Sequence, residues 1–306
     1  MNIDGVLPVM KPAGYTSHDV VAKTRRILRM KRIGHTGTLD PQVTGVLPLC
    51  LGKATKLVEY IQELPKEYEA VLRIGVATDT EDATGEILET AEHIELTSEV
   101  VERTIQSFVG SISQVPPMYS AIKVGGKRLY ELAREGQVVE RKAREVTIYS
   151  IEIINLDLDK PFPEVRFRAL CSKGTYIRTL CVDIGRSLGY PATMAELIRT
   201  STGNITMDQS YTLEEIEAAQ VAGTLQQLLI PMEEAVAHMI RADIKPHKLL
   251  QALQGQKLQT NDVSPFKARE GDILAAFTDA GKLAGFYRYE ETEGRLVPVK
   301  IFSEQD

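Results

Sequence analysis

One carboxylate stands out because it lies in a stretch that no regular element accounts for. Asp40 occurs within a glycine- and threonine-rich segment, 33-IGHTGTLDPQVTGVLPLCLGKATK-56, which is too broken for a helix. A carboxylate has a reference pKa of about 3.9 and is ionised near neutral pH, so it can serve as a nucleophile without an activating base. An aspartate before a proline is also a common turn residue. The residue types alone leave both interpretations open.

The same segment fits none of the common phosphate-binding or hydrolytic motifs. Six residues separate Gly45 from Gly52, where a P-loop has four, and Ala54 stands where that loop needs serine or threonine. Gln42 replaces the second aspartate of a phosphatase-type site. The sequence contains no GxSxG, HExxH or GxGxxG. Two-carboxylate glycosidase chemistry stays open, although no partner for Asp40 is evident.

Composition and cysteine usage indicate a globular protein of a reducing compartment. The 306 residues are 43% hydrophobic, enough for one large core and a second small domain. No apolar run has 18 residues, and the N-terminus lacks the pattern of a secretory signal, so we expect a cytoplasmic protein without a membrane span. The three cysteines form no CxxC pair, which argues against a structural zinc site. We expect buried, reduced thiols and no bound metal.

Charge is distributed unevenly along the chain. The net charge is −6, yet residues 1–60 carry +5, residues 61–119 carry −9, residues 120–180 carry +4 and residues 181–306 carry −6. Two basic blocks between acidic ones would suit a protein with one face for an anionic ligand. Ordinary surface scatter explains the charges about equally well. The carboxylates of residues 77–86 fit no EF-hand, and we expect a solvated turn there.

The regular elements expected around Asp40 follow from capping and periodicity. Ser17 is predicted to cap a helix that runs to about Met30. Residues 67–76 alternate as a strand with Tyr68 on the core face. A helix is expected from about Tyr176 to residue 188, and its periodicity favours a surface position for Arg178. The last 65 residues predict a separate, small β-rich domain.

The segment around Asp40 resembles the catalytic motif of the TruB family of tRNA pseudouridine synthases. The resemblance continues, in family order, through 68-YEAVLRIGVATDTEDATGE-86, 115-VPPMYSAIKVGGKRLYELAREG-136 and 170-LCSKGTYIRTLCVDIG-185. It covers nearly the whole catalytic part of the chain. The C-terminal residues resemble a PUA-type RNA-binding domain in their position and β-rich pattern.

This resemblance implies a fold and a reaction. The fold would be α+β, with a mixed, mainly antiparallel sheet, flanking helices and a central cleft. Residues 1–239 would form the catalytic domain, with a thumb-like segment at about 120–146, and residues 240–306 a PUA-like domain. The reaction would isomerise a uridine in the T-loop of tRNA (position 55) to pseudouridine. Such an isomerisation requires no cofactor.

The resemblance also implies a role for individual residues at the site. Asp40 would be the nucleophile, and Arg178 would pair with it. Tyr68 would stack on the target uracil and is a candidate base, although its alternation pattern also suits a core residue. Tyr176 and the backbone of Leu197 would contact the flipped uracil. His35 would take a place in the RNA fold when the target base leaves it, and Lys11 would support the catalytic loop. The implied RNA-binding residues of the thumb-like segment are Lys123, Lys127, Arg128 and Arg134.

The expected partner is tRNA alone, bound by a monomer without guide RNA or a protein subunit. Two other interpretations are carried forward. One is a relative that depends on a guide RNA inside a ribonucleoprotein. The other is a non-catalytic tRNA-folding chaperone, since flipping a base out of the T-loop requires the tRNA elbow to open.

Overall fold

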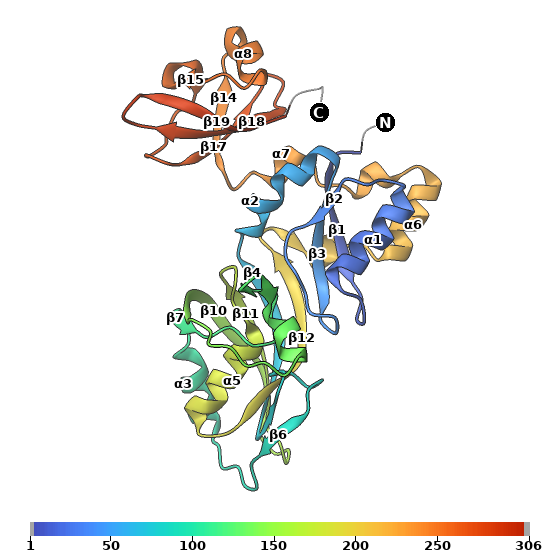
Figure 1. The fold of residues 1–306 in the computed structure, drawn as a ribbon, viewed down its shortest axis with the longest axis vertical. Helices are drawn as coiled ribbons and strands as arrows, with labels where there is room; N and C mark the ends of the chain where they lie inside the picture. The colour runs from blue at the N-terminus through green and yellow to red at the C-terminus, as the bar shows by residue number, and fades with distance from the viewer. Residues whose placement is uncertain (1–2, 303–306) are drawn as a thin grey trace.

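The computed structural model describes residues 3–302, and their strands form two large sheets and two short hairpins (Figure 1). In spatial order, the first sheet contains β1 (Gly5–Lys11), β3 (Thr44–Leu51), β12 (Ala192–Thr202), β4 (Lys66–Ile74), β11 (Glu164–Cys171), β10 (Arg144–Asp157) and β7 (Gly110–Gln114). Two short strands extend it, β2 (Ile33–His35) beside β3 and β13 (Ile205–Thr206) beside β12. The hairpins are β5 (Val76–Thr78) with β6 (Ile87–Thr90), and β8 (Lys123–Val124) with β9 (Lys127–Arg128).

Strand β12 lies at the centre of this sheet and determines its mixed character. It runs parallel to β3 and antiparallel to β4, whereas the other neighbours in the sheet are antiparallel. In this register Arg199 of β12 lies opposite Gly45 of β3 on one side and Tyr68 of β4 on the other. Segments that are far apart in the sequence therefore meet beside the Asp40 loop (residues 36–43).

Helices cover the first sheet on more than one side (Figure 1). The α-helices are α1 (Ser17–Leu28), α2 (Val58–Gln62), α3 (Ser98–Gln106), α4 (Leu129–Arg134), α5 (Ile177–Leu188), α6 (Leu213–Ala222), α7 (Met232–Ala235) and α8 (Leu249–Leu253). The 3-10 turns are Gly52–Leu57, Met207–Gln209, Leu225–Leu228, Pro246–Lys248 and Thr260–Asp262. Helices α3 and α5 close a core with β4, β10, β11 and β12, while α1 and α6 pack on β1 and β3. Within residues 3–302, no helix has the length and apolarity needed to cross a membrane.

The start of α1 differs from the prediction. Thr16, not Ser17, is the N-cap: the Asp19 amide donates to the Thr16 hydroxyl at 3.1 Å, and the Asp19 carboxylate accepts from the Thr16 amide at 2.8 Å. This reciprocal capping box satisfies two backbone N–H donors at the helix start. Ser17 is buried instead. Its hydroxyl is thereby free to contact the Asp40 loop.

The alternation predicted for β4 is confirmed on its core face. Ala70, Leu72 and Ile74 are fully buried in the core that α3 and α5 close. Tyr68, two residues before Ala70, packs at the edge of that core and is partly exposed. It therefore belongs to the core strand and also reaches the side chains around Asp40.

The C-terminal sheet forms a separate β-rich domain, drawn at the top of Figure 1. Its spatial order is β15 (Leu258–Gln259), β19 (Arg295–Ile301), β18 (Leu283–Glu290), β17 (Ile273–Phe277), β14 (Ile240–Ile244) and β16 (Val263–Ser264). Phe286 and Phe302 pack in one apolar cluster with residues of β1, β3 and α2, so the two sheets share a core. The predicted α+β fold with a small β-rich C-terminal domain is confirmed. Its predicted limits and RNA-binding role stay predictions.

Candidate functional site

The Asp40 loop is attached to the rest of the protein by a buried lysine. Lys11, at the end of β1, is fully buried. Its ammonium group donates to the carbonyls of Pro41 at 2.9 Å and Val43 at 2.7 Å, which both follow Asp40 in the loop. Burial lowers the pKa of Lys11 to about 8, although the nearby Asp40 carboxylate acts in the opposite direction. The lysine thus fixes the loop backbone through hydrogen bonds.

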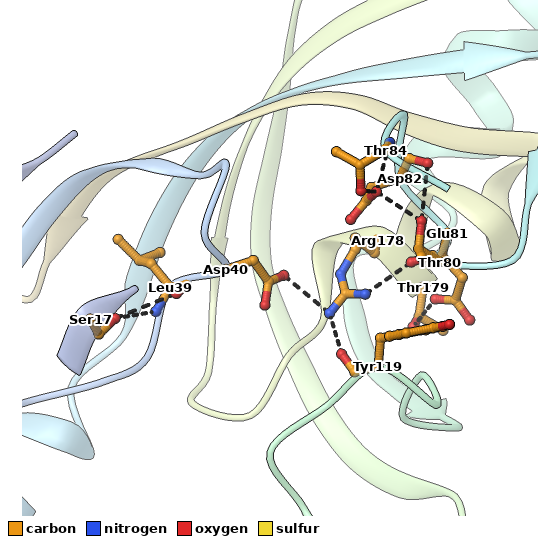
Figure 2. A network of polar contacts seen from close by, with 10 residues as sticks. All are labelled: Ser17, Leu39, Asp40, Thr80, Glu81, Asp82, Thr84, Tyr119, Arg178 and Thr179. Carbon is orange, nitrogen blue, oxygen red and sulfur yellow. Dashed lines mark hydrogen bonds and ion pairs between the residues drawn. The ribbon is translucent and has the colours of Figure 1, made fainter. Parts of the chain in front are cut away.

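Ser17 holds the other side of the loop. The Leu39 amide donates to the Ser17 hydroxyl at 2.9 Å, and Leu39 itself is buried (Figure 2). Because Leu39 precedes Asp40, this bond limits the orientation that the aspartate can take. Sequence reasoning missed this role because it assigned the Ser17 hydroxyl to helix capping.

Arg178 of α5 pairs with Asp40, and the two partners differ sharply in exposure (Figure 2). A guanidinium nitrogen lies 3.1 Å from the carboxylate, and the side chain of Arg178 is 5% exposed while that of Asp40 is 41% exposed. The guanidinium also donates to the carbonyls of Thr80 at 2.9 Å and Tyr119 at 2.7 Å. The surface position that periodicity favours for Arg178 is therefore wrong, because it lies in the first turn of α5, where two long connections cover it.

The charge state of Asp40 depends on opposing influences. Burial raises the pKa of its carboxyl above the ordinary 3.8, the Arg178 guanidinium lowers it, and the Asp82 carboxylate raises it again. Arg178 is thus the principal group that favours the ionised form. The carboxylate remains open to solvent on one side, which is the side from which a substrate could approach.

The turn predicted at residues 77–86 is present and partly exposed, but it also contributes to the site. Thr80 supplies a carbonyl to Arg178, and Asp82 lies near enough to Asp40 to affect its pKa. The Asp82 carboxylate accepts hydrogen bonds from the hydroxyls of Thr80 at 2.8 Å and Thr84 at 2.6 Å, which fix the turn (Figure 2). The density of Asp and Thr in 79-DTEDAT-84 is the sequence signal for such self-bonded structure.

Tyr176 and His35 come from different elements, and Tyr176 lies near enough to Asp40 for the carboxylate to affect its pKa. Tyr176 precedes α5, and the Gln114 side chain binds both its amide at 2.8 Å and its carbonyl at 3.0 Å. Burial raises the pKa of the Tyr176 phenol. His35 lies at the end of β2 and stacks edge-on against His18 with ring centres 5.3 Å apart. Burial lowers the pKa of the His35 imidazole, which favours its neutral form.

Tyr68 and Leu197 are neighbours across the β4–β12 ladder. Leu197 lies opposite Ala70 and packs on the same core as Tyr68. Burial raises the pKa of the Tyr68 phenol, while Arg199 lowers it both by its charge and by a side-chain hydrogen bond. Sequence reasoning missed Arg199, since nothing local distinguishes it from the other arginines of the sheet.

The thumb-like residues are not gathered around Asp40. Lys123 and Lys127 are exposed on the β8–β9 hairpin, and Lys127 pairs with Glu135 at 2.9 Å. Arg128 and Arg134 both lie near the Tyr130 ring, 5.7 and 5.5 Å from its centre. The residue just before this segment contacts the site, where the Tyr119 carbonyl accepts from Arg178.

Comparison with known proteins identifies the class. Residues 25–177 match the TruB family pseudouridylate synthase N-terminal domain, and residues 178–237 match the tRNA pseudouridylate synthase B C-terminal domain. A Bacillus licheniformis protein named tRNA pseudouridine synthase B is 46% identical over 303 residues, 97% of each chain. One of the same name from Geobacillus kaustophilus is 50% identical over 247 residues, covering 79% of this chain and 86% of that one.

Solved structures with the same fold come from ribonucleoproteins. The chain in an H/ACA ribonucleoprotein bound to a substrate RNA has a TM-score of 0.77 at 26% identity, covering 99% of this chain and 86% of that one. A chain of a Cbf5-Nop10-Gar1 complex has a TM-score of 0.77 at 28% identity, covering 98% and 84%. Fold and matched residues together define a pseudouridylate synthase. Within that class, the chain belongs to the TruB family, as the motif resemblance predicts.

Proposed function

We propose that this protein isomerises a uridine in the T-loop of tRNA to pseudouridine, with Asp40 as the nucleophile. The observation that carries the proposal is the ion pair of an accessible carboxylate with a buried guanidinium. This arrangement keeps Asp40 ionised and oriented while one side of it stays open to substrate. The names of the full-length relatives, tRNA pseudouridine synthase B, support tRNA as the substrate.

The reaction requires that the target base leave the RNA stack. A uracil within a folded loop cannot present C1′ and C5 to a carboxylate, so it must be flipped out at a cost of a few kcal/mol. Stacking on an aromatic ring contributes about 1–3 kcal/mol per base and can offset that cost. Tyr68 is the partly exposed aromatic residue beside Arg199 and is proposed to stack on the uracil. Tyr176, His35 and the backbone of Leu197 are proposed to contact the flipped base and the loop it leaves.

The proposed chemistry is balanced without an oxidant or reductant. The bond between N1 of uracil and C1′ of the ribose breaks, the base turns, and C5 bonds to C1′. C5 then loses its proton to a base, for which Tyr68 is the candidate, and N1 gains a proton. Asp40 attacks the nucleotide as the N1–C1′ bond breaks, and its own bond to the nucleotide breaks before the product leaves, which regenerates the free carboxylate. Lys11 and Ser17 fix the loop backbone on both sides of Asp40, so that the carboxylate starts near its reacting position.

We further propose that the protein acts on tRNA alone, without guide RNA or a protein subunit. The full-length similarity to proteins named tRNA pseudouridine synthase B supports this choice over the ribonucleoprotein relatives, which are 26–28% identical. Lys123, Lys127, Arg128 and Arg134 are proposed to contact RNA phosphates, since cations that track the backbone supply sequence-independent affinity. A monomer in the cytoplasm stays a prediction.

The test is tritium release from an unmodified tRNA transcript that carries 5-³H-uridine. Wild-type protein should release tritium without added cofactor or guide RNA, and Asp40→Asn should bind the same transcript without releasing it. A transcript with cytidine at the target T-loop position is the control for site specificity. No release by the wild type despite tight tRNA binding would favour the chaperone or the guide-dependent interpretation. Equal release by both proteins would exclude Asp40 as the nucleophile.

A further inference from the structure

Arg199 of β12 is a buried cation without a carboxylate partner. It is 1% exposed and is the largest of the fully buried side chains. Among residues 3–302, no Asp or Glu lies within ion-pair distance of its guanidinium. Buried charges in proteins are generally paired or bound to a ligand, because removing a charge from water is costly. The position of Arg199 therefore requires an explanation beyond packing.

The guanidinium group instead joins three segments of the site. It donates to the Val46 carbonyl of β3 at 2.7 Å and to the Gly37 carbonyl of the Asp40 loop at 3.3 Å. Its third neighbour is Tyr68, which lies opposite Arg199 in the β4–β12 register and whose phenol the guanidinium charge affects. The two carbonyls are neutral dipoles and do not neutralise a full positive charge. The phenol is the one contact of the three that can become an anion.

The neighbouring backbone makes room for this arginine. A Cβ atom at Gly45, where φ is +114°, would lie 2.2 Å from the Arg199 carbonyl oxygen. A Cβ atom at Gly37 would lie 3.4 Å from a guanidinium nitrogen. Glycine at position 45 permits the close approach of β12 to β3, whereas the distance at Gly37 is an ordinary van der Waals contact. Gly45 of the Asp40 segment thus has a structural reason that involves Arg199.

We propose that Arg199 is a positioning residue: it fixes the Tyr68 hydroxyl beside the Asp40 loop and supplies the positive charge that balances the phenolate when Tyr68 acts as base. The inference rests on the proposed function for its catalytic meaning. The phenolate oxygen would accept the C5 proton and become a neutral phenol. That phenol would return the proton to solvent after product release, so no net charge or electron is gained.

Without a compensating charge, burial would prevent Tyr68 from acting as a base, because it disfavours the phenolate. A phenol has a reference pKa of about 10, and burial disfavours its anion further. A permanently charged guanidinium on the neighbouring strand acts in the opposite direction. A purely structural arginine would hold the three segments together equally well, yet it would not affect how Tyr68 titrates. The titration of Tyr68 therefore separates the two roles.

The first experiment measures that titration in the free protein, without tRNA. Tyr68 is replaced by 3-fluorotyrosine, and the ¹⁹F shift is followed against pH in otherwise wild-type protein and in Arg199→Met. The phenol pKa should rise by about 1–3 units in Arg199→Met, the range by which a neighbouring opposite charge shifts a pKa. Lys11→Met is the control for loss of a buried basic side chain alone: the pKa of Lys11 is lowered to about 8, its bonds go to loop carbonyls, and the phenol pKa should not change. Equal phenol pKa values with and without Arg199 would overturn the proposal.

A second measurement does not depend on the Arg199 variant folding. In the fluorotyrosine protein itself, the ¹⁵N shifts of the Arg199 guanidinium should change with the same midpoint as the ¹⁹F shift. Shifts that stay constant through that titration would overturn the proposal. Neither measurement uses RNA, so failure of the proposed tRNA reaction would be seen separately in the tritium-release assay.

The third measurement connects the titration to turnover. Tritium release by Arg199→Met should be strongly reduced near neutral pH, because less of the Tyr68 phenolate forms. Arg199→Lys, which keeps a positive charge, should retain more activity at neutral pH than Arg199→Met. An equal loss of activity in the two variants would assign Arg199 a structural role only.

Discussion

The arginines on the two faces of the sheet formed by β4, β11 and β12 differ in exposure and in ion pairing. On one face, Arg73, Arg166 and Arg168 are 36–39% exposed and pair with glutamates of neighbouring strands, for example Arg166 with Glu69 at 3.1 Å. On the other face, Arg199 is fully buried and has no carboxylate partner among the described residues. Arg178, from the helix that packs on that face, is 5% exposed and pairs with the more open Asp40.

This difference indicates where function determines the residue choice. An exposed ion pair contributes about 0–1 kcal/mol, because water and salt screen it. A buried cation costs several kcal/mol unless a partner compensates for it. The exposed face can therefore change its charges with little consequence. The buried face retains cations at an energetic cost, which is expected where those charges act on a reacting group.

The largest expected effect is the loss of activity in Arg178→Met. Without the guanidinium, burial and Asp82 would raise the pKa of Asp40 further, and the carboxylate would lose its orientation. We expect tritium release to fall by about 10²–10³-fold, as for removal of a preorganised charge at a reacting centre. The remaining activity should require a higher pH, because Asp40 must be ionised.

Arg168→Met is the matched control on the opposite face. It removes an arginine that contacts Glu69 and Glu152 at the exposed surface, at 3.5 and 3.2 Å. Its tritium release should stay within about twofold of wild type, since exposed pairs contribute little. A comparable loss in both variants would show that the two faces do not differ in the way described here.

The next effect concerns the close approach between β3 and β12. Gly45→Ala should lower the free energy of unfolding by about 3 kcal/mol or more, because its Cβ would overlap the Arg199 backbone at 2.2 Å and its φ is +114°. Gly174→Ala has a similar positive φ of +81° with no atom within 4 Å, so it should cost only about 1–2 kcal/mol. Urea unfolding measures both. Equal losses would mean that backbone conformation alone, and not the approach of Arg199, determines the cost.

The sequence allowed accurate predictions where the signal is local or repeated. The alternation of Ala70, Leu72 and Ile74 identified the core face of β4, and the Asp40 segment was recognisable from its motif. Both patterns are read from residues close together in the chain. The C-terminal change to short strands likewise indicated a β-rich domain.

The errors all concern contacts between distant segments. Arg178 is buried by the carbonyls of Thr80 and Tyr119, which lie 98 and 59 residues away in the chain. Ser17 reaches Leu39 across 22 residues, although its local context equally suits a cap. Arg199 acquires its importance from its register with Tyr68, and one sequence does not reveal which strands pair. Helical periodicity also says little about the first turn of a helix, where connecting segments decide exposure.

A smaller effect is the pH dependence of the stability that one carboxylate on each face contributes, which should have opposite signs. The pKa of Asp40 is raised, chiefly by burial, so its contribution to stability is present below pH 3.8 and is lost as pH rises through the folded-state pKa. The pKa of Glu164 is lowered, chiefly by Lys160 and also by Arg73, so its contribution is present above pH 4.5 and is lost as pH falls. Relative to Asp40→Asn, the wild type should become more stable in acid. Relative to Glu164→Gln, it should become less stable.

Chemical unfolding across the acidic range measures both differences. Each should amount to less than about 1 kcal/mol, because the Asp40 side chain is 41% exposed and Glu164 lies in a surface network. Asp40→Asn should therefore remain as stable as wild type near neutral pH while releasing no tritium. The site disfavours the charged form of Asp40, whereas the surface favours the charged form of Glu164. If the two differences in unfolding free energy changed with pH in the same direction, this contrast would be contradicted.

The smallest expected effect is the coupling between Arg166 and Glu196 on the exposed face. A double-mutant cycle with Arg166→Met and Glu196→Gln should give about 0.2–1 kcal/mol, since the atoms are 2.8 Å apart but the side chains are 36% and 61% exposed. The coupling should decrease in 1 M salt, where the screening length is about 3 Å. A coupling energy that is larger and insensitive to salt would mean that water does not screen this ion pair. The exposed face would then resemble the buried one, and burial alone could not support the proposal that Arg178 and Arg199 are the arginines that act in the reaction.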